Sequence, residues 1–219
     1  MNLQIIKGNL FTSTCQTLVN TVNCVGVMGA GVALEFRLRH PEMYERYVQL
    51  CQQKKIDIGK LWLYKTDQRW ILNFPTKKHW KHNSQLQFLE LGLQKFVDTY
   101  EKKGITSIAF PMLGTHNGGI PVDEALAVMK QYLSSCSLPV EIYLYDPIAP
   151  DDIFAQIKER FLSLSDPEIT KITSLKQPYL GRVKQAMQQE QLCSLASLLS
   201  TEGIGISTIE KTLLVLQMS

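Results

Sequence analysis

The sequence predicts a three-layer α/β domain, in which helices cover both faces of a central sheet. Short apolar runs that are typical of buried strands alternate with amphipathic helical patterns along most of the chain. Two glycine-rich loops each follow such a run, at the edge where α/β sheets usually bind ligands. We therefore expect one α/β domain over residues 1–164 and a small helical extension over residues 165–219.

The composition is that of an ordinary globular protein with a mild positive charge. The 219 residues are 45% hydrophobic, and the net charge of +3 permits an anionic ligand or nucleic acid without requiring one. The five cysteines are scattered, with no CxxC or Cys/His cluster, so we expect neither disulfides nor a metal site. Because no signal peptide or apolar run of about 20 residues is visible, we expect a reduced, cytoplasmic protein without a membrane segment.

A first strand is predicted over residues 3–7, and Gly8, Asn9 and Leu10 close it. Asn9 then falls at the carboxyl end of a strand, where an amide could accept from the amino group of an adenine and donate to a ring nitrogen. Capping the turn that starts at Leu10 is the commoner role of an asparagine in this position. Both interpretations stay open.

The stretch over residues 17–33 is the most informative part of the chain. An apolar run over residues 17–19 predicts a buried strand, and a helical pattern begins after the last glycine. Glycines let backbone N–H groups approach an oxyanion, and a helix N-terminus carries partial positive charge, so the pattern favours an anion site. It has no Walker lysine and fits GxGxxG spacing poorly, and a tight turn without a ligand is the alternative. The stretch supplies two amides and three glycines: Asn20, Asn23, Gly26, Gly29 and Gly31.

A helix and a hairpin are expected next, followed by a cluster of cations and an aromatic ring. The elements are a helix over residues 41–53, strands over 61–64 and 70–74, and a helix over 85–103 with Ser84 as its N-cap. Between the last strand and that helix lie Lys77, Lys78, His79, Trp80, Lys81 and His82. A solvated basic loop is one explanation of such a charge run. The alternative is that lysines contact phosphates while Trp80 stacks on a base of single-stranded nucleic acid.

A second glycine-rich loop, over residues 111–120, follows the strand predicted over residues 107–110. We expect a helix over residues 122–133 and a strand over residues 140–145 after it. Two such loops at one edge of a sheet could hold a diphosphate between them, which is a stronger signal than either loop alone. His116 in this loop could contact a ligand, act as a general acid or simply be a loop histidine.

The last part of the chain predicts helices without a clear function. Two amphipathic helices with a glycine turn could form a helix-turn-helix reader of DNA. A small interaction module or a lid explains them more simply, because a basic recognition face is missing. The expected elements are a helix over 153–164 that closes the domain, linkers over 163–167 and 176–178, and helices over 183–199 and 206–216 around Gly203 and Gly205.

Five segments of the chain match motifs of one known family. They are Lys7–Leu10, Leu18–Asn23, Gly26–Ala33, Asn73–Lys77 with His79 and Trp80, and Pro111–Pro121. In these segments residues 1–147 resemble a macrodomain, and within that family the chain is most similar to the DarG-type antitoxins that remove ADP-ribose from DNA. The resemblance implies an α/β/α fold with a mixed central sheet and no cofactor. It implies ADP-ribose and ADP-ribosylated DNA as partners, with a cognate ADP-ribosyltransferase toxin as a further candidate.

The resemblance also implies roles for individual residues. Lys77 matches the catalytic lysine of related glycohydrolases, and Asn23 would lie beside the distal ribose. Gly118 stands near the position of an aspartate in a related eukaryotic branch, so a Lys–Asp pair is not available. The implied contacts with nucleic acid are Lys78, His79, Trp80 and Lys81. The implied contacts with ADP-ribose are Asn9, Leu10, Asn20, Val25, Gly26, Val27, Met28, Gly29, Gly31, Val32, Thr76, Pro111, Leu113, Gly114, Thr115, His116, Asn117, Gly118 and Gly119.

The chemistry of cleavage adds one requirement, because an amine must be neutral to attack the anomeric carbon of the distal ribose. Burial and a neighbouring cation such as Lys78 would lower the pKa of Lys77, whereas a bound diphosphate would raise it. Lys77 could instead hold phosphate without reacting. Three functions remain open: a glycohydrolase acting on DNA, a reader that binds ADP-ribose without turnover, and an esterase in which Asn23 positions a water.

Overall fold

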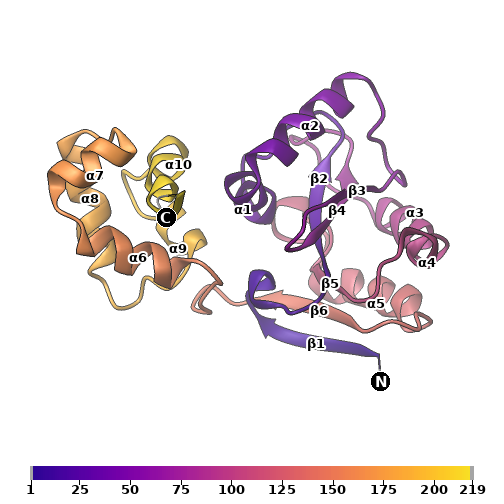
Figure 1. Cartoon of the computed structure of the whole chain (residues 1–219). Coiled ribbons are helices and arrows are strands. Elements are labelled where there is room, and N and C mark those ends of the chain that lie inside the picture. The colour runs from indigo at the N-terminus through magenta and orange to yellow at the C-terminus, as the bar shows by residue number, and fades with distance from the viewer. Residues whose placement is uncertain (1, 218–219) are drawn as a thin grey trace. The chain divides into compact units, whose positions relative to one another are not determined.

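The computed structural model describes residues 2–217 of the chain (Figure 1). The chain folds as two compact units, residues 1–145 and residues 146–219. The first unit contains a β-sheet with its helices, and the second consists of helices. The division therefore comes earlier in the chain than the boundary that we expected at residue 164.

Within residues 2–217, six strands form one sheet in the order β1-β6-β5-β2-β4-β3. The strands β3 and β4 pair antiparallel, and the other neighbours pair parallel, so the expected mixed sheet is confirmed. Because parallel strands share a carboxyl edge, the loops after β1, β2, β4 and β5 lie at the same edge of the sheet. The strands are β1 (Leu3–Gly8), β2 (Thr17–Asn23), β3 (Trp62–Lys65), β4 (Trp70–Lys77), β5 (Ile108–Pro111) and β6 (Val140–Tyr145).

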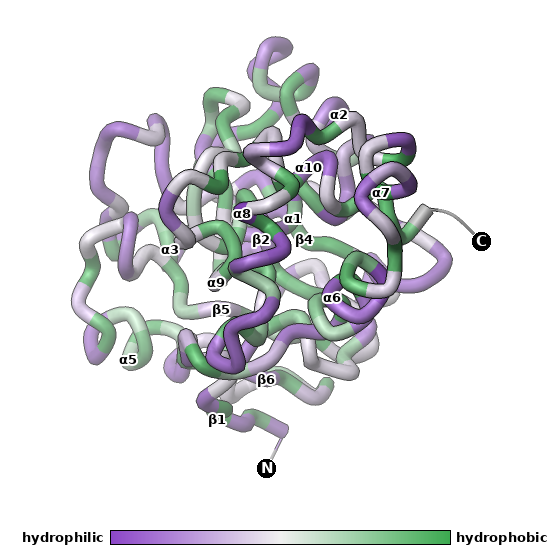
Figure 2. The backbone as a smooth tube through the Cα atoms, turned by 90° about the vertical axis from the view of Figure 1, so that its left-hand side faces the viewer, coloured by the Kyte–Doolittle hydropathy of each residue, from purple (hydrophilic) through white to green (hydrophobic). Residues whose placement is uncertain are grey.

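Helices cover both faces of this sheet, which confirms the predicted three layers (Figure 1). Neighbouring strand residues serve opposite cores because side chains alternate along a strand. Leu18 of β2 belongs to the core on one face, whereas Val19 belongs to the core on the other. The strand β5 is largely hydrophobic in Figure 2, as expected for a strand that is covered on both faces. The helices are α1 (Gly31–Arg39) and α2 (Pro41–Gln52) on the first face, and α3 (Leu86–Val97) and α5 (Val122–Leu133) on the second.

The helix predicted over residues 85–103 is two helices in the structure, because helical structure is interrupted between Val97 and the start of α4 (Tyr100–Lys103). The expected N-cap is also wrong: Gln85 occupies the N-cap position of α3, without a side-chain hydrogen bond. Ser84 is instead buried, and its backbone N–H donates to the carbonyl of Gly118 at 2.9 Å. Contact with the second glycine-rich loop has taken the place of helix capping.

The second unit begins with the helix that we expected to close the first domain. That helix, α6, packs against α8, α10 and η3 of its own unit, so assigning it to the first domain was wrong. Its apolar residues Phe154, Ile157 and Phe161 are almost fully buried. No helix within residues 2–217 has the length and apolar character needed to cross a membrane. The elements are α6 (Phe154–Ser163), α7 (Asp166–Thr173), α8 (Gln177–Met187), α9 (Leu195–Leu199), α10 (Ile206–Leu213) and η3 (Leu214–Gln217).

Both segments expected to be linkers are helix starts. Ser165 and Glu168 form a capping box at the start of α7, and Pro167 lies in its first turn. Pro178 lies in the first turn of α8. Proline is favourable there because the first N–H groups of a helix have no partner within it. These prolines therefore mark where helices begin, not where structure is lost.

The helix pair expected over residues 183–199 and 206–216 is also divided differently. The helix α8 ends at Met187, and the side chain of Ser194 caps the separate helix α9. The helix α10 begins at Ile206, as expected. The cap at Ser194 starts a new helix inside the segment that we predicted as one helix over residues 183–199. The continuous apolar pattern of that segment gave no sign of this division.

Candidate active site at the sheet edge

Three loops meet at the carboxyl edge of the sheet. We call residues 24–31 the first glycine loop, residues 78–85 the basic segment and residues 112–121 the second glycine loop. They follow β2, β4 and β5, which are consecutive in the order β5-β2-β4. A Cβ atom at Gly31 would lie 3.1 Å from Nδ2 of Asn117, so the two glycine loops approach each other as the sequence predicted.

The shape of the first glycine loop is fixed by Asn23, the last residue of β2. Oδ1 of Asn23 accepts from the backbone N–H groups of Val25 at 3.0 Å and Val27 at 3.3 Å. Its Nδ2 donates to the carbonyl of Val27 at 2.5 Å. The buried hydroxyl of Tyr47 donates to the backbone carbonyl of Asn23 at 2.6 Å. Both polar atoms of the Asn23 amide are therefore engaged within the loop.

Backbone geometry prepares the first glycine loop for an anion. Gly26 and Gly31 have φ angles of +81° and +56°, in the left-handed region that favours glycine. The N-cap of α1 is Ala30, which makes no side-chain cap, so the first N–H groups of the helix keep their capacity to donate. A helix N-terminus with free donors beside a second glycine loop suits a phosphate.

Lys77, the last residue of β4, reaches from its strand to the second glycine loop. It lies opposite Asn23 in the parallel pairing of β4 with β2. Its Nζ donates to the carbonyl oxygen of Asn117, and a Cβ atom at Gly118 would lie 3.9 Å from its Cε. Burial lowers the pKa of the Lys77 amine below its ordinary value. One amine with a lowered pKa is thus held against the second glycine loop, at the residue that the first glycine loop approaches.

Lys78 does not supply the neighbouring cation that we considered for Lys77. Its Nζ bonds the carboxylate of Asp57, which raises the pKa of Lys78 and lowers that of Asp57. Successive residues of an extended chain point in opposite directions, so the two lysines diverge. Burial alone accounts for the lowered pKa of Lys77, and the interpretation of Lys78 as its electrostatic neighbour is wrong.

The rest of the basic segment forms an aromatic cluster at the surface. Trp80 is 49% exposed, and its ring stacks with that of His79 at 5.7 Å between centroids. Nζ of Lys81 lies 5.1 Å from the centroid of the Trp80 ring. The backbone N–H of Lys81 donates to Nδ1 of His79 at 3.2 Å, which ties the cluster together. An exposed ring flanked by cations can stack on a base of a single strand.

The second glycine loop contains the short helix η2 (His116–Gly118). His116 has a φ angle of +41°, which is rare outside glycine, and its Nδ1 lies 3.1 Å from Oγ1 of Thr115. Its ring packs edge-on against Tyr145 at 6.1 Å. The contacts with Thr115 and Tyr145 agree with the simple interpretation of His116 as a loop residue.

Two predicted contact residues have structural partners. Oδ1 of Asn9 accepts from the backbone N–H of Phe11 at 3.0 Å, so Asn9 caps the helix η1 (Leu10–Thr12). Nδ2 of Asn9 has no hydrogen-bond partner within residues 2–217 and stays able to donate. Asn20 is fully buried, and its Nδ2 donates to Oδ1 of Asn73 on the neighbouring strand at 2.9 Å. Asn20 therefore joins two strands and presents no surface to a ligand.

The other predicted contacts divide by exposure. Exposed are Val25, Gly29, Gly31, Asn117 and Gly119, and half-buried are Val27, Val32 and Pro111. Buried are Leu10, Gly26, Met28, Thr76, Leu113, Gly114, Thr115 and Gly118. Within residues 2–217, no group of three or more His, Cys, Asp or Glu residues is placed to hold a metal ion.

Sequence reasoning missed Ser84 as part of the site. Its Oγ is buried without a hydrogen-bond partner among the described residues, and it lies 2.6 Å from where a Cβ atom at Gly118 would be. Buried polar atoms rarely stay unpaired, so the hydroxyl next to the second glycine loop suits a ligand or an ordered water. A serine just before a predicted helix is normally interpreted as its N-cap, and nothing in the sequence indicated that Ser84 instead contacts the second glycine loop.

Comparisons with known proteins identify the family of the first unit. The family model described as "Macro domain" matches residues 19–129. A relative from Thermus aquaticus, described as "DNA ADP-ribosyl glycohydrolase", is 40% identical over 150 residues, which are 67% of this chain and 41% of that protein. A relative from Thermosipho africanus, described as "DNA ADP-ribosyl transferase-DNA ADP-ribosyl glycohydrolase fusion protein", is 36% identical over 74% of this chain and 46% of its own length.

A solved structure described as "Thermosipho africanus DarTG in complex with ADP-ribose" is similar to the same region. It superposes with a TM-score of 0.63 at 38% identity and covers 66% of this chain and 42% of that one. The chain spans less than half the length of these two curated relatives.

Proposed function

The chain belongs to the macrodomain family, and from this premise we propose that it removes ADP-ribose from a nucleobase in single-stranded DNA. The observation that carries the proposal is the position of Lys77. Its amine lies against the second glycine loop, and burial lowers its pKa. The relatives' descriptions as DNA ADP-ribosyl glycohydrolases support the same reaction.

The two glycine loops would bind the diphosphate of ADP-ribose. Free N–H groups at the start of α1 and in the loops are donors for its oxygens. Nδ2 of Asn9 remains able to donate to the adenine, although Oδ1 is used in capping. Held in this way, the distal ribose would lie at the Lys77 end of the site, where its anomeric carbon meets the amine.

The reaction follows from a neutral Lys77 amine. Its lone pair forms a bond to the anomeric carbon while the bond from that carbon to the base breaks, and the base leaves with the electron pair and takes up a proton. Water then replaces the lysine and releases ADP-ribose. Burial favours the neutral amine, whereas the bound diphosphate opposes it. The rate should therefore rise with pH as Lys77 loses its proton.

The basic segment is the part of the site that would take the DNA strand. Trp80 with His79 and Lys81 offers a stacking face and positive charge next to the end of β4. Lys78 shares its charge with Asp57 and contributes less than we expected from the sequence. A DNA ADP-ribosyltransferase must produce the substrate, and the fused relative from Thermosipho africanus supports a toxin of that class as the partner.

A reader that binds ADP-ribose without turnover is the second candidate. The observation in its favour is the hydrogen bond from Lys77 to the carbonyl of Asn117, since an ammonium group held there could serve phosphate binding alone. The esterase alternative is weaker, because it needs Asn23 to position a water. Both polar atoms of that amide already bond the first glycine loop.

The decisive experiment compares Lys77→Ala with Lys78→Ala. The two lysines are adjacent and carry the same charge, but only Lys77 bonds the second glycine loop. We expect Lys77→Ala to slow release of ADP-ribose from a modified single-stranded oligonucleotide by about 100-fold or more, with ADP-ribose still bound in a calorimetric titration. Lys78→Ala should keep most of the activity.

Each alternative predicts a different result in the same assays. Full activity in Lys77→Ala would remove lysine catalysis from the proposal. Tight binding of ADP-ribose by the unmodified chain, with no product after hours, would identify a reader. Release from carboxylate-linked ADP-ribose but not from modified DNA would identify an esterase.

A further inference from the structure

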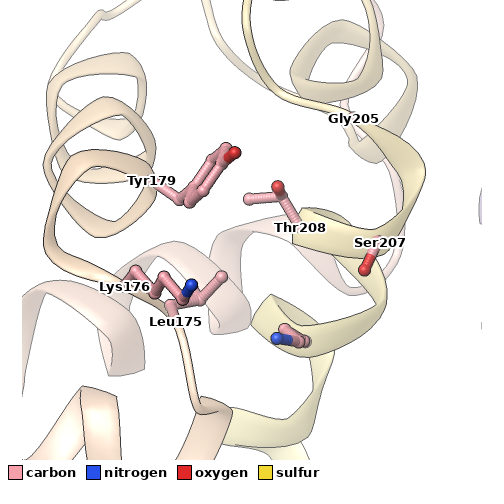
Figure 3. A pocket seen from close by; sticks show the side chains of 7 residues that line it. Leu175, Lys176, Tyr179, Gly205, Ser207 and Thr208 are labelled. Carbon is pink, nitrogen blue, oxygen red and sulfur yellow. The ribbon is translucent and has the colours of Figure 1, made fainter.

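The second unit contains a cavity of about 350 Å³ between the start of α8 and the start of α10 (Figure 3). It is well separated in sequence from the glycine loops, and nothing in the proposed activity of the first unit uses it. The residues that line it and carry chemistry are Lys176, Tyr179, Gly205, Ser207, Thr208 and Lys211. They include two cations, an aromatic ring and three hydroxyls, and no acidic residue.

The start of α10 supplies backbone donors to this cavity. Gly205 is the N-cap residue and makes no side-chain cap, so the N–H groups of Ile206 and Ser207 have no partner within the helix. A Cβ atom at Gly205 would meet nothing within 4 Å, so there is open space beside the N-cap residue. Gly203, two residues earlier, has a φ angle of +76° and turns the chain into the helix.

Thr208 provides an independent sign that the cavity takes a ligand. The residue is only 7% exposed and lines the cavity, where its side chain faces Tyr179 in Figure 3. Within residues 2–217, its hydroxyl has no hydrogen-bond partner, because the bonds in which Thr208 takes part use its backbone N–H and its backbone carbonyl. Polar atoms of a residue that is mostly buried usually have a partner, and the cavity is where Thr208 can meet a ligand.

The charges and the ring of the cavity fit a phosphate with a nucleoside beside it. Lys176 precedes α8 and Lys211 lies on α10, so the two cations approach from different helices. Nζ of Lys211 donates to the carbonyl of Ser174 at 3.3 Å, which holds that side chain at the rim. The Tyr179 ring is 43% exposed and forms a wall on which a base or ribose can stack.

We propose that this cavity binds a backbone phosphate of a nucleic-acid strand, with Tyr179 against the adjacent nucleoside. Cations, helix N–H groups and hydroxyls donate hydrogen bonds to phosphate oxygens. Such contacts hold a strand in place without reading its sequence. This differs from the helix-turn-helix reader that we considered from the sequence, which needs a basic helix in a groove. Lys176, Tyr179, Gly205 and Ser207 are exposed, so a continuous strand can pass where an enclosed pocket would take only a free nucleotide.

The test uses the full chain and an unmodified single-stranded oligonucleotide, with binding followed by fluorescence anisotropy. Lys176→Gln is compared with Lys171→Gln, which removes the same charge from an exposed lysine of α7 outside the cavity. We expect Lys176→Gln to weaken binding about threefold to tenfold. It should also reduce the slope of log affinity against log salt by about 0.7, as the loss of one phosphate contact requires. Equal effects of the two variants would overturn the proposal.

Thr208→Val separates a binding role from a structural one. Valine matches the shape of threonine without its hydroxyl, and an unpaired buried hydroxyl contributes little to stability. We expect weaker oligonucleotide binding with an unchanged or raised thermal midpoint. A lowered midpoint with unchanged binding would assign the hydroxyl to the fold and overturn its role here.

Two further measurements identify the source of the phosphate and keep the two sites apart. In NMR titrations the amides of Ile206 and Ser207 should shift with the oligonucleotide, and inorganic phosphate or AMP should compete only weakly. If AMP saturates these amide shifts and the oligonucleotide does not compete with it, the occupant of the cavity is a free nucleotide and the proposed strand is wrong. Repeating the anisotropy comparison in a Trp80→Ala chain removes the stacking face of the first unit, and ADP-ribose release is not measured. A failed glycohydrolase proposal would therefore leave this result intact.

Discussion

Substitution of Gly118 by alanine tests whether the packing of the basic segment on the second glycine loop sets the affinity for ADP-ribose. The backbone of Gly118 is not in the left-handed region, so alanine brings little conformational strain. The added Cβ atom would lie 2.6 Å from Oγ and 3.2 Å from Cβ of Ser84. Ordinary contacts of a Cβ atom begin at 3.4 Å, so either the serine or the loop has to move.

The size of the effect follows from this overlap. Rotation of the Ser84 side chain can relieve the contact with Oγ. The contact with Cβ persists, so the second glycine loop has to shift to relieve it. Overpacking of this kind costs about 1–3 kcal/mol. If the free loop relaxes and binding restores it, ADP-ribose affinity falls by about fivefold to 150-fold, since each 1.4 kcal/mol is a factor of ten.

The assay is a calorimetric titration with ADP-ribose on a set of variants. Ser84→Gly removes both contacts, so the double variant Gly118→Ala with Ser84→Gly should regain most of the lost affinity. Gly181→Ala is the matched control, because a Cβ atom there meets nothing within 4 Å. The reasoning is refuted if Gly118→Ala binds as tightly as the unmodified chain, or if removing the Ser84 side chain restores nothing.

Three other predictions concern the core, the amine and the surface ion pair. Gly92→Ala should lower the midpoint of denaturant unfolding although it favours the helix, because its Cβ atom would lie 2.2 Å from Cζ of Phe74, and Phe74→Leu should recover part of the loss. Release of ADP-ribose should rise with pH on a limb whose apparent pKa lies below 10.5, since burial lowers the pKa of Lys77; a rate that falls over this range would contradict it. Lys78→Ala should raise the pKa of Asp57 toward 3.8 in an NMR titration, because the bonded ammonium lowers it. The stability that this pair contributes is present above the unfolded pKa of Asp57 and is lost as the pH falls through the folded value, but for so exposed a pair it is only about 0–1 kcal/mol.

The first unit could be predicted from sequence because its signals are local and repeated. Each strand is a short apolar run, and the glycine loops follow β2 and β5 directly, so strand order alone brings them to one edge. Parallel pairing then placed residues far apart in sequence, such as Gly31 and Asn117, next to each other. The side-chain contacts within that edge were not predictable, because both Asn23 and Ser84 have common roles elsewhere.

The second unit was predicted less well because its helices are short and begin at residues that also occur in linkers. Pro167 and Pro178 lie in first helical turns, and Ser194 caps a helix of its own. Proline and serine have the same local preference at the end of a loop and at the start of a helix. The packing of α6 on α8 and α10 decided between these alternatives, and that packing depends on residues distant in sequence.

An irregularity in strand pairing decides which of two adjacent lysines reaches the glycine loops. Val22 of β2 pairs with Pro75 of β4, but the next residue, Asn23, pairs with Lys77. Thr76 is thus an extra residue on β4, and a bulge of this kind redirects the side chains that follow it. With regular pairing Thr76 would stand opposite Asn23, and the lysine would begin one position beyond the strand. The bulge instead sets the Lys77 amine against Asn117 while Lys78 turns to Asp57, so the two lysines have separate roles although the sequence presents them as a pair.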